Sequence, residues 1–277
     1  MSNRVLYSPG RSIEKYKNTE KIEYVLNIIR KRKKEHIKWR HEMEHVIGDN
    51  HKFPLISVIT PTIRKNQIHD IINNFNNQLY PNKELIIVAP KNTINKIDNN
   101  NIKLVEVNSP ILGKDINIGI ENSNGNIIAK MDDDDYYTPE FLMDQYLHYV
   151  DVDPDITGTN AIFIWYEDEK LLWYRYFGLY NQFAMDNGSG RYKLSSGGTL
   201  FFKRKVWEKC NFREIKVSED SCFQRDAYEL GFNIYLNDSF SYCYVRKHSD
   251  FHTFKRGPQH VGYPIYNNIN LVRAYEI

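Results

Sequence analysis

The chain has 277 residues, 41% of them hydrophobic, 14% aromatic and 26% charged, a composition that can bury a large core and excludes a disordered polymer. Its net charge of +2 excludes a polycation that coats nucleic acid, so we expect no nucleic-acid partner. Three cysteines without a paired spacing (Cys210, Cys222 and Cys243) indicate free thiols in a reducing compartment. The sequence shows neither a signal pattern nor an apolar run of about 18 residues, so we expect a cytoplasmic protein, with attachment to the inner face of a membrane left open.

A basic helical extension is expected over residues 1–50, which carry 12 Lys and Arg against 7 Asp and Glu. Residues 11–47 are predicted to be helical, because four apolar side chains recur at helical spacing: Ile22, Val25, Leu26 and Ile29. Five consecutive basic residues follow at 30–34. Three interpretations are open: a solvated helix face, a surface that binds an anionic membrane or polymer, or a helix that self-associates through the apolar stripe.

Residues 51–255 are predicted to form an α/β domain, because short apolar runs alternate with segments of helical periodicity. The runs predicted as strands are 55–60, 84–88, 103–107 and 126–131, and the predicted helices between them are 66–79 and 115–122. This alternation favours a mostly parallel, Rossmann-like sheet flanked by helices, with ligands at the carboxyl ends of its strands. The second half is less regular, with an aromatic hairpin at 161–180, a helix at 225–230 and a tail at 256–277.

Four consecutive aspartates, Asp132 to Asp135, follow the fourth predicted strand. Their charges would repel one another unless a cation lies among them, and carboxylate oxygens suit Mg²⁺ or Mn²⁺. Such an ion would neutralise charge on a leaving diphosphate. A solvated acidic turn is the alternative, and the position at the end of a sheet strand favours the metal interpretation over it.

The segment 113–142 resembles the stretch of family-two glycosyltransferases that leads into their Asp-x-Asp signature. The matching residues are, in chain order, Asn117, Gly119, Gly125, Asp132, Asp134, Asp135 and Pro139, and the pairs Pro61-Thr62 and Tyr80-Pro81 fit the same family. The resemblance covers residues 53–255 and implies a GT-A fold, with a nucleotide-sugar half at 51–140 and an acceptor half at 141–255. The implied reaction is an inverting transfer from a nucleotide-sugar to an unknown acceptor hydroxyl, with Mn²⁺ or Mg²⁺.

The resemblance also implies roles for single residues. Asp134 would be the main metal ligand, Asp220 the general base and Glu219 a supporting group for the acceptor, while Asp135 would close the turn. Donor binding is expected from Pro61, Thr62, Arg64, Lys114, Asn117, Asp132, Asp133, Gly197, Gly198 and Arg246. His252 would complete the metal shell. A purely structural alternative is that Ser218 caps a helix whose first turn carries Glu219 and Asp220.

The acceptor side is the least defined part of the sequence. Trp173 and Tyr176, in the aromatic hairpin, are candidates for a platform on which a sugar stacks, although aromatic residues in strands more often belong to a core.

One departure from the family concerns the nucleobase. The family carries an Asp after its second strand that recognises the base, whereas this chain has Val88-Ala89-Pro90-Lys91-Asn92 there. UDP is favoured, but the base is not fixed by the sequence. Two other classes are compatible with the residues: a catalytically silent module that binds a sugar-nucleotide, and a metal-dependent nucleotidyltransferase. The latter usually needs a glycine-rich loop after the first strand, which 62–65 lacks.

Overall fold

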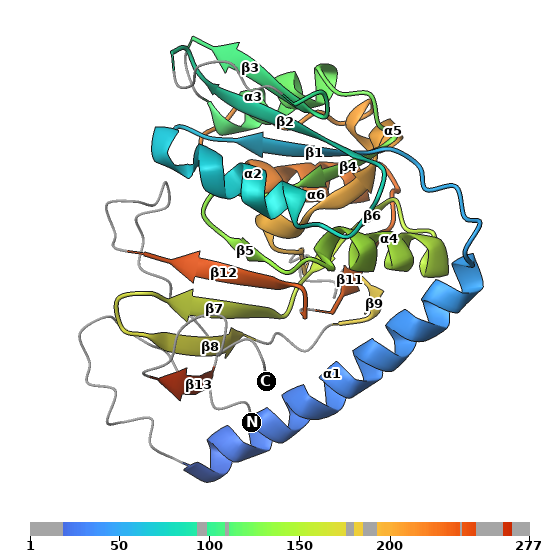
Figure 1. Ribbon diagram of the computed structural model, residues 1–277, viewed down its shortest axis with the longest axis vertical. Coiled ribbons are helices and arrows are strands. Elements are labelled where there is room, and N and C mark those ends of the chain that lie inside the picture. Colours follow the sequence, from blue (N-terminus) through green and yellow to red (C-terminus); the bar gives the residue numbers. More distant parts are fainter. Residues whose placement is uncertain are drawn as a thin grey trace.

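The computed structural model describes residues 19–92, 99–108, 111–175, 180–184, 193–238, 240–247 and 263–267. Within these residues the strands form two sheets, and a long N-terminal helix, α1 (Thr19–Ile47), runs beside the second of them (Figure 1). The predicted break at 48–50 follows α1 directly. The part of the predicted helix at 11–18 lies outside the described residues.

The first sheet has eight strands. Their spatial order is β3 (Ile102–Val107), β2 (Lys83–Pro90), β1 (Ile56–Pro61), β4 (Ile127–Lys130), β10 (Phe201–Lys203), β6 (Ile156–Thr159), β11 (Ile234–Asn237) and β9 (Gln182–Phe183). The strands β3, β2, β1 and β4 pair in parallel, and β10 is antiparallel to both of its neighbours. The continuous apolar run predicted a strand covered on both faces, and all six residues of β1 are buried.

Helices cover both faces of this sheet. Ile68 of α2 (Ile68–Asn76) and Phe141 of α4 (Phe141–Val152) share a core with Val58 of β1. Ile116 of α3 (Leu112–Glu121) and Phe223 of α6 (Glu219–Glu229) share another core with Ile59. Successive residues of β1 therefore face opposite helix layers. The short helices η2 (Lys65–Gln67), η3 (Gly197–Thr199) and α5 (Arg204–Trp207) lie in the connections. The expected parallel-rich sheet flanked by helices is confirmed.

A second sheet of five strands was not predicted beyond its central hairpin. Its order is β13 (Tyr263–Asn267), β8 (Leu171–Arg175), β7 (Ile162–Tyr166), β12 (Tyr242–Arg246) and β5 (Tyr136–Tyr137). The hairpin β7–β8 confirms the prediction for 161–180. The expected tail at 256–277 contributes β13, which pairs with β8, so part of it belongs to the folded body.

The apolar stripe of α1 packs on the outer face of the second sheet. Val25, Leu26 and Ile29 are buried together with Phe163 and Tyr174. The stripe is therefore covered within the chain, and self-association through it, one of the three interpretations, is wrong.

Some of the basic residues of α1 also have structural roles. Arg32 is buried and donates a hydrogen bond of 2.8 Å to the hydroxyl of Tyr174. Arg40 holds Asp144 of α4 with two hydrogen bonds of 2.7 and 2.8 Å. Lys31 and Lys38 are exposed, so only part of the basic run is a solvated face. The described helices include none that is long and apolar enough to cross a membrane.

Candidate active site

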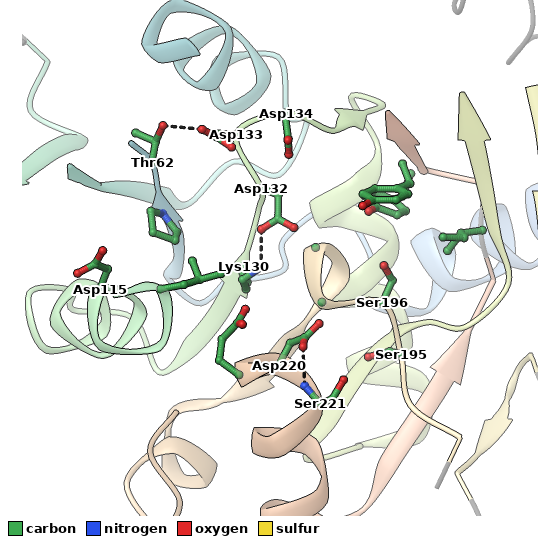
Figure 2. Close-up of a pocket in the computed structure, with 18 of the residues that line it drawn as sticks. Thr62, Asp115, Lys130, Asp132, Asp133, Asp134, Ser195, Ser196, Asp220 and Ser221 are labelled. Carbon is green, nitrogen blue, oxygen red and sulfur yellow. Dashed lines mark hydrogen bonds and ion pairs between the residues drawn. The ribbon is translucent and has the colours of Figure 1, made fainter. Parts of the chain in front are cut away.

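A cavity of about 760 Å³ opens at the carboxyl ends of β1 and β4, where the first sheet meets the second (Figure 2). It brings together most of the residues expected from the sequence: Pro61, Thr62, Arg64, Asp132, Asp133, Asp134, Gly197, Gly198, Glu219, Asp220 and Arg246. These residues come from five separate segments of the chain. Their convergence follows from the parallel strands, whose carboxyl ends lie at the same edge of a sheet.

The acidic turn after β4 is held by two cations of the protein itself. Lys130 forms an ion pair with Asp132. Arg64 Nη1 lies 2.5 Å from Asp133 Oδ1 and 2.9 Å from Asp134 Oδ2. We expected a cation among the four carboxylates, and Arg64 and Lys130 each place a positive charge there.

Two of the four carboxyl groups are deeply engaged in the protein. Asp135 is buried; its Oδ2 accepts a hydrogen bond of 2.5 Å from the Tyr242 hydroxyl, and its Oδ1 one of 3.0 Å from the Val245 N–H. These contacts tie the turn to β12. Burial, followed by the charge of Asp134, raises the pKa of Asp133 to about 6. Asp132 and Asp134 are the more exposed carboxylates of the turn, with side chains 30% and 16% exposed.

Asp220 lies in the first turn of α6. Its Oδ1 accepts a hydrogen bond of 2.6 Å from the Ser221 N–H, and this carboxylate borders the cavity near Ser196 (Figure 2). Ser218 has a left-handed backbone (φ 68°) and forms no side-chain capping bond. Ser218 thus occupies the N-cap position, as the structural alternative supposed, but without the side-chain capping bond.

Two glycines form the seam between Asp220 and the acidic turn. A Cβ on Gly197 would lie 2.0 Å from Asp220 Oδ2. A Cβ on Gly198 would lie 2.9 Å from Asp132 Oδ2 and 3.0 Å from Asp135 Oδ2. Both positions need glycine because any side chain would displace a carboxylate. The close approach places Asp220 and Asp132 on the two sides of one short segment.

Lys130 is the cation at the centre of these groups and was not predicted. Its side chain is 3% exposed, and the charges of Asp132, Glu219 and Asp220 overcome burial and raise its pKa. Burial, reinforced by Asp220 and opposed by Lys130, raises the pKa of Glu219 to about 7. A lysine inside the apolar run 126–131 was a signal in the sequence, because a buried lysine needs anionic partners.

The second sheet closes the other side of the cavity with residues that sequence reasoning largely missed. Arg175 of β8, Tyr242, Tyr244 and Arg246 of β12 line it. Arg246 is 8% exposed, and its guanidinium lies 5.0 Å from the centre of the Tyr244 ring. Burial lowers the pKa of Arg175. Two guanidinium groups therefore face the cavity opposite the first sheet.

Some expected site residues do not reach the cavity. Asn117 donates to Phe212 O (2.8 Å) and accepts from Trp207 Nε1 (2.9 Å) and the Phe212 N–H (3.0 Å), so its side chain joins α3 to the segment after α5 and corrects the donor-binding assignment. Lys114 is not among the lining residues. Trp173 is 1% exposed in the core beneath the sheets, so it cannot be an acceptor platform.

Two further residues predicted for the site lie elsewhere in the chain. Tyr176 and His252 lie outside the described residues. In the part of the chain that the structure describes, no group of three or more His, Cys, Asp or Glu side chains is arranged to hold a metal ion. Among the residues that line the cavity and were not predicted from the sequence are Asp115, Ser195, Lys216 and Arg175.

Known structures share this fold. The crystal structure of TarS 1-349 from S. aureus superposes with a TM-score of 0.53 at 18% identity, covering 69% of this chain and 60% of that one. The structure of TarS 1-349 in complex with UDP-GlcNAc gives 0.52, over 70% of this chain and 59% of that one. At this identity the likeness concerns the fold, and the expected GT-A fold is confirmed.

Sequence comparison gives the family. The glycosyltransferase GlyA of Streptococcus pneumoniae serotype 4 (strain ATCC BAA-334 / TIGR4) is 24% identical over 217 residues, which are 70% of this chain and 31% of that protein. The chain thus spans about a third of the length of this relative. The family model described as "Glycosyl transferase family 2" matches residues 57–210, more than half of the chain. The chain therefore belongs to glycosyl transferase family 2.

Proposed function

We propose that this chain transfers a sugar, with inversion, from a nucleotide-sugar to an acceptor hydroxyl, and that the donor is a UDP-sugar. The observation that carries the proposal is the seam at Gly197 and Gly198, which brings Asp220 and the acidic turn into one cavity. A volume of about 760 Å³ lies in the range of small-molecule sites. The TarS structure in complex with UDP-GlcNAc supports a uridine nucleotide.

In this reaction Asp220 acts as the general base. Its Oδ2 takes the proton of the acceptor hydroxyl as the oxygen attacks the anomeric carbon. The bond from that carbon to the diphosphate breaks on the opposite face, and its electron pair leaves with the nucleoside diphosphate, so the configuration inverts. Glu219, whose pKa of about 7 lets it hold a proton near neutral pH, can donate a hydrogen bond to the acceptor.

The diphosphate requires positive charge, and three of the cationic side chains that line the cavity are assigned to it: Arg64, Lys130 and Arg246. A guanidinium can bind two phosphate oxygens at once, which favours Arg64 and Arg246 for this task. Lys130 is paired with Asp132, so it holds the acidic turn in place, and its positive charge adds to that of the two guanidinium groups.

The carboxylates of the acidic turn provide only some of the ligands that a divalent cation needs. Asp134 and Asp132 provide hard oxygen ligands of the kind that Mg²⁺ and Mn²⁺ prefer. Because the described residues contain no group of three ligands, diphosphate oxygens, waters or His252 would have to supply the rest. When bound there, the ion would neutralise charge on the leaving diphosphate. Arg64 would then keep its contact with Asp133 and release Asp134.

Binding calorimetry tests the donor site. UDP, GDP and ADP are titrated in Mn²⁺, Mg²⁺ or EDTA into the wild type, Asp134→Asn, and Asp70→Asn, an exposed aspartate in the first turn of α2 that serves as matched control. We expect one nucleotide to bind with metal, and Asp134→Asn to bind it at least 10-fold more weakly while the control is unchanged. Absence of nucleotide binding under every condition would refute the donor site. Binding without any turnover of UDP-sugars would identify a silent binding module.

A further inference from the structure

Asp115 is a buried carboxylate in the cavity with one oxygen that lacks a hydrogen-bond partner among the described residues. It is 4% exposed, it lines the cavity, and its Oδ1 has no hydrogen-bond partner among the described residues. The neighbours that act on it are the Ile111 backbone, which hydrogen-bonds the carboxylate, and Lys114. A buried polar atom without a partner costs stability, so its presence in a binding cavity calls for an explanation.

The packing of α3 explains where Asp115 lies. Gly119, one turn later on the same helix face, packs so closely on β1 that a Cβ there would be 2.6 Å from Ile59 Cγ2. Asp115 is therefore placed beyond Ile59, toward the carboxyl end of β1, where Pro61 also lines the cavity. Figure 2 shows it on the Thr62 side, away from Ser195 and Ser196.

Asp115 lies apart from Asp134 and Asp220, two of the groups assigned to the diphosphate and the reacting sugar (Figure 2). Its unpartnered carboxylate oxygen can only accept a hydrogen bond and would repel phosphate. The part of a nucleotide-sugar that offers N–H and O–H donors away from the diphosphate is the nucleoside.

We propose that Asp115 Oδ1 accepts a hydrogen bond from the nucleoside of the donor, either from a nucleobase N–H or from a ribose hydroxyl, and so selects the nucleotide. The inference rests on the proposed function. It assigns to α3 the recognition that an aspartate after the second strand would otherwise perform, a position at which this chain has 88–92 without any acidic residue.

Paired changes in protein and ligand test the contact. The wild type, Asp115→Ala and Asp115→Asn are titrated with UDP, 3-methyl-UDP, 2′-deoxy-UDP and 3′-deoxy-UDP, or with the corresponding GDP analogues if the wild type prefers GDP. We expect UDP to bind Asp115→Ala about 10- to 100-fold more weakly, the range for a hydrogen bond to a charged group. Asp70→Asn is the matched control, because it removes an exposed carboxylate from the first turn of another helix.

The contacted group is identified by the analogue that binds the wild type more weakly than UDP but binds Asp115→Ala as well as UDP does. If Asp115 binds the base, methylation at N3 weakens binding to the wild type and causes no further loss in Asp115→Ala. If Asp115 binds the ribose, removal of the contacted hydroxyl weakens binding to the wild type and causes no further loss in Asp115→Ala. Either result supports the proposal. Equal discrimination by wild type and variants overturns it while the donor site stands. A wild type that binds no nucleotide refutes the proposed function as well.

Folding can be checked separately. Asp115→Asn keeps the shape and removes a buried charge, so we expect its melting temperature to be equal to or higher than that of the wild type. If Asp115→Ala fails to fold, Asp115→Leu carries the test with the same expected loss of discrimination, because leucine has a similar volume and cannot accept a hydrogen bond. A leucine variant that binds and discriminates as the wild type does would overturn the proposal.

Discussion

Two buried aspartates, each in the first turn of a helix, have opposite surroundings. Asp144 of α4 is 2% exposed; it accepts hydrogen bonds from Arg40, and His36 Nε2 lies 3.2 Å from its Oδ2. Although burial alone would raise the pKa of Asp144, His36 and Arg40 lower it. Asp115 of α3 has an oxygen without a partner, and burial raises its pKa to about 6. The chain completes the first carboxylate itself and leaves the second incomplete.

The same contrast holds for the regions around them. Between α1 and α4, Trp39 adds a hydrogen bond of 2.9 Å to Asp151 and stacks on His148 at 4.0 Å, so the contact is largely filled by the protein. Around the cavity, charged groups from both sheets face an open volume. Although His36 Nδ1 and His148 Nδ1 have no hydrogen-bond partner among the described residues, the carboxylate of Asp144 is paired with cations of the chain itself, whereas the carboxylates of the cavity face space that a ligand can enter. We therefore expect substitutions in the first region to change stability and those in the second to change activity.

The largest effect is expected from Asp220→Asn. Loss of a general base slows transfer by roughly 10²- to 10⁴-fold, while the shape of the site and nucleotide affinity are kept. The measurement is the release of nucleoside diphosphate from a UDP-sugar, together with nucleotide affinity and melting temperature. A variant that turns over as fast as the wild type would show that another group takes the proton.

Asp144→Asn should give the opposite pattern. It leaves Arg40 without its buried anion, which costs roughly 3–5 kcal/mol of unfolding free energy. Donor turnover per folded molecule should stay unchanged, because the contact lies outside the cavity lining. Urea unfolding measures the loss, and Glu42→Gln, which breaks only an exposed pair with Lys38, is the control with an effect below about 0.5 kcal/mol. Loss of turnover in the folded protein would contradict the division into two regions.

The substitution Gly197→Ala tests the close contact between Gly197 and the carboxylate of Asp220. The added Cβ would force Asp220 away from its position, and a displacement of this kind lowers the turnover number by about 10- to 100-fold. The affinity for nucleoside diphosphate should change less, since the displaced group serves the acceptor side. An alanine variant with full turnover would mean that the carboxylate can move without loss.

The two buried aspartates should also respond to pH with opposite signs. Between pH 3.8 and about 6 the folded protein keeps the Asp115 proton while the unfolded chain loses it, so the wild type loses stability relative to Asp115→Asn as pH rises. For Asp144, whose pKa is lowered, the unfolded chain binds more protons, and the wild type loses stability relative to Asp144→Asn as pH falls below about 4. Unfolding in urea at several pH values measures the sign of each difference, which for Asp115 reaches roughly 3 kcal/mol. Two curves of the same sign would contradict the comparison.

Local pattern predicted the first sheet well. Strands covered on both faces appear as apolar runs, and 55–60, 84–88 and 103–107 match β1, β2 and β3 within a few residues. The acidic turn and Asp220 were placed correctly in the cavity because parallel strands end at one edge.

The second sheet and several cavity residues depended on contacts distant in sequence. β12 pairs with β7, about eighty positions earlier, and no local pattern encodes that pairing. On β8, Trp173 faces one core and Tyr174 the other, so the strand had no aromatic face free for a sugar. Asp115 was missed because its place depends on the packing of Gly119 against β1.

Hydrogen exchange with and without nucleotide tests the central claim, that the cavity rather than the α1–α4 contact binds the donor. Amide exchange would be followed by mass spectrometry in the wild type with UDP-GlcNAc and Mn²⁺. We predict slower exchange at 61–64, 112–116, 131–135 and 195–198, and no change at 36–40 or 144–151. Protection confined to α1 and α4, with the cavity segments unchanged, would contradict it.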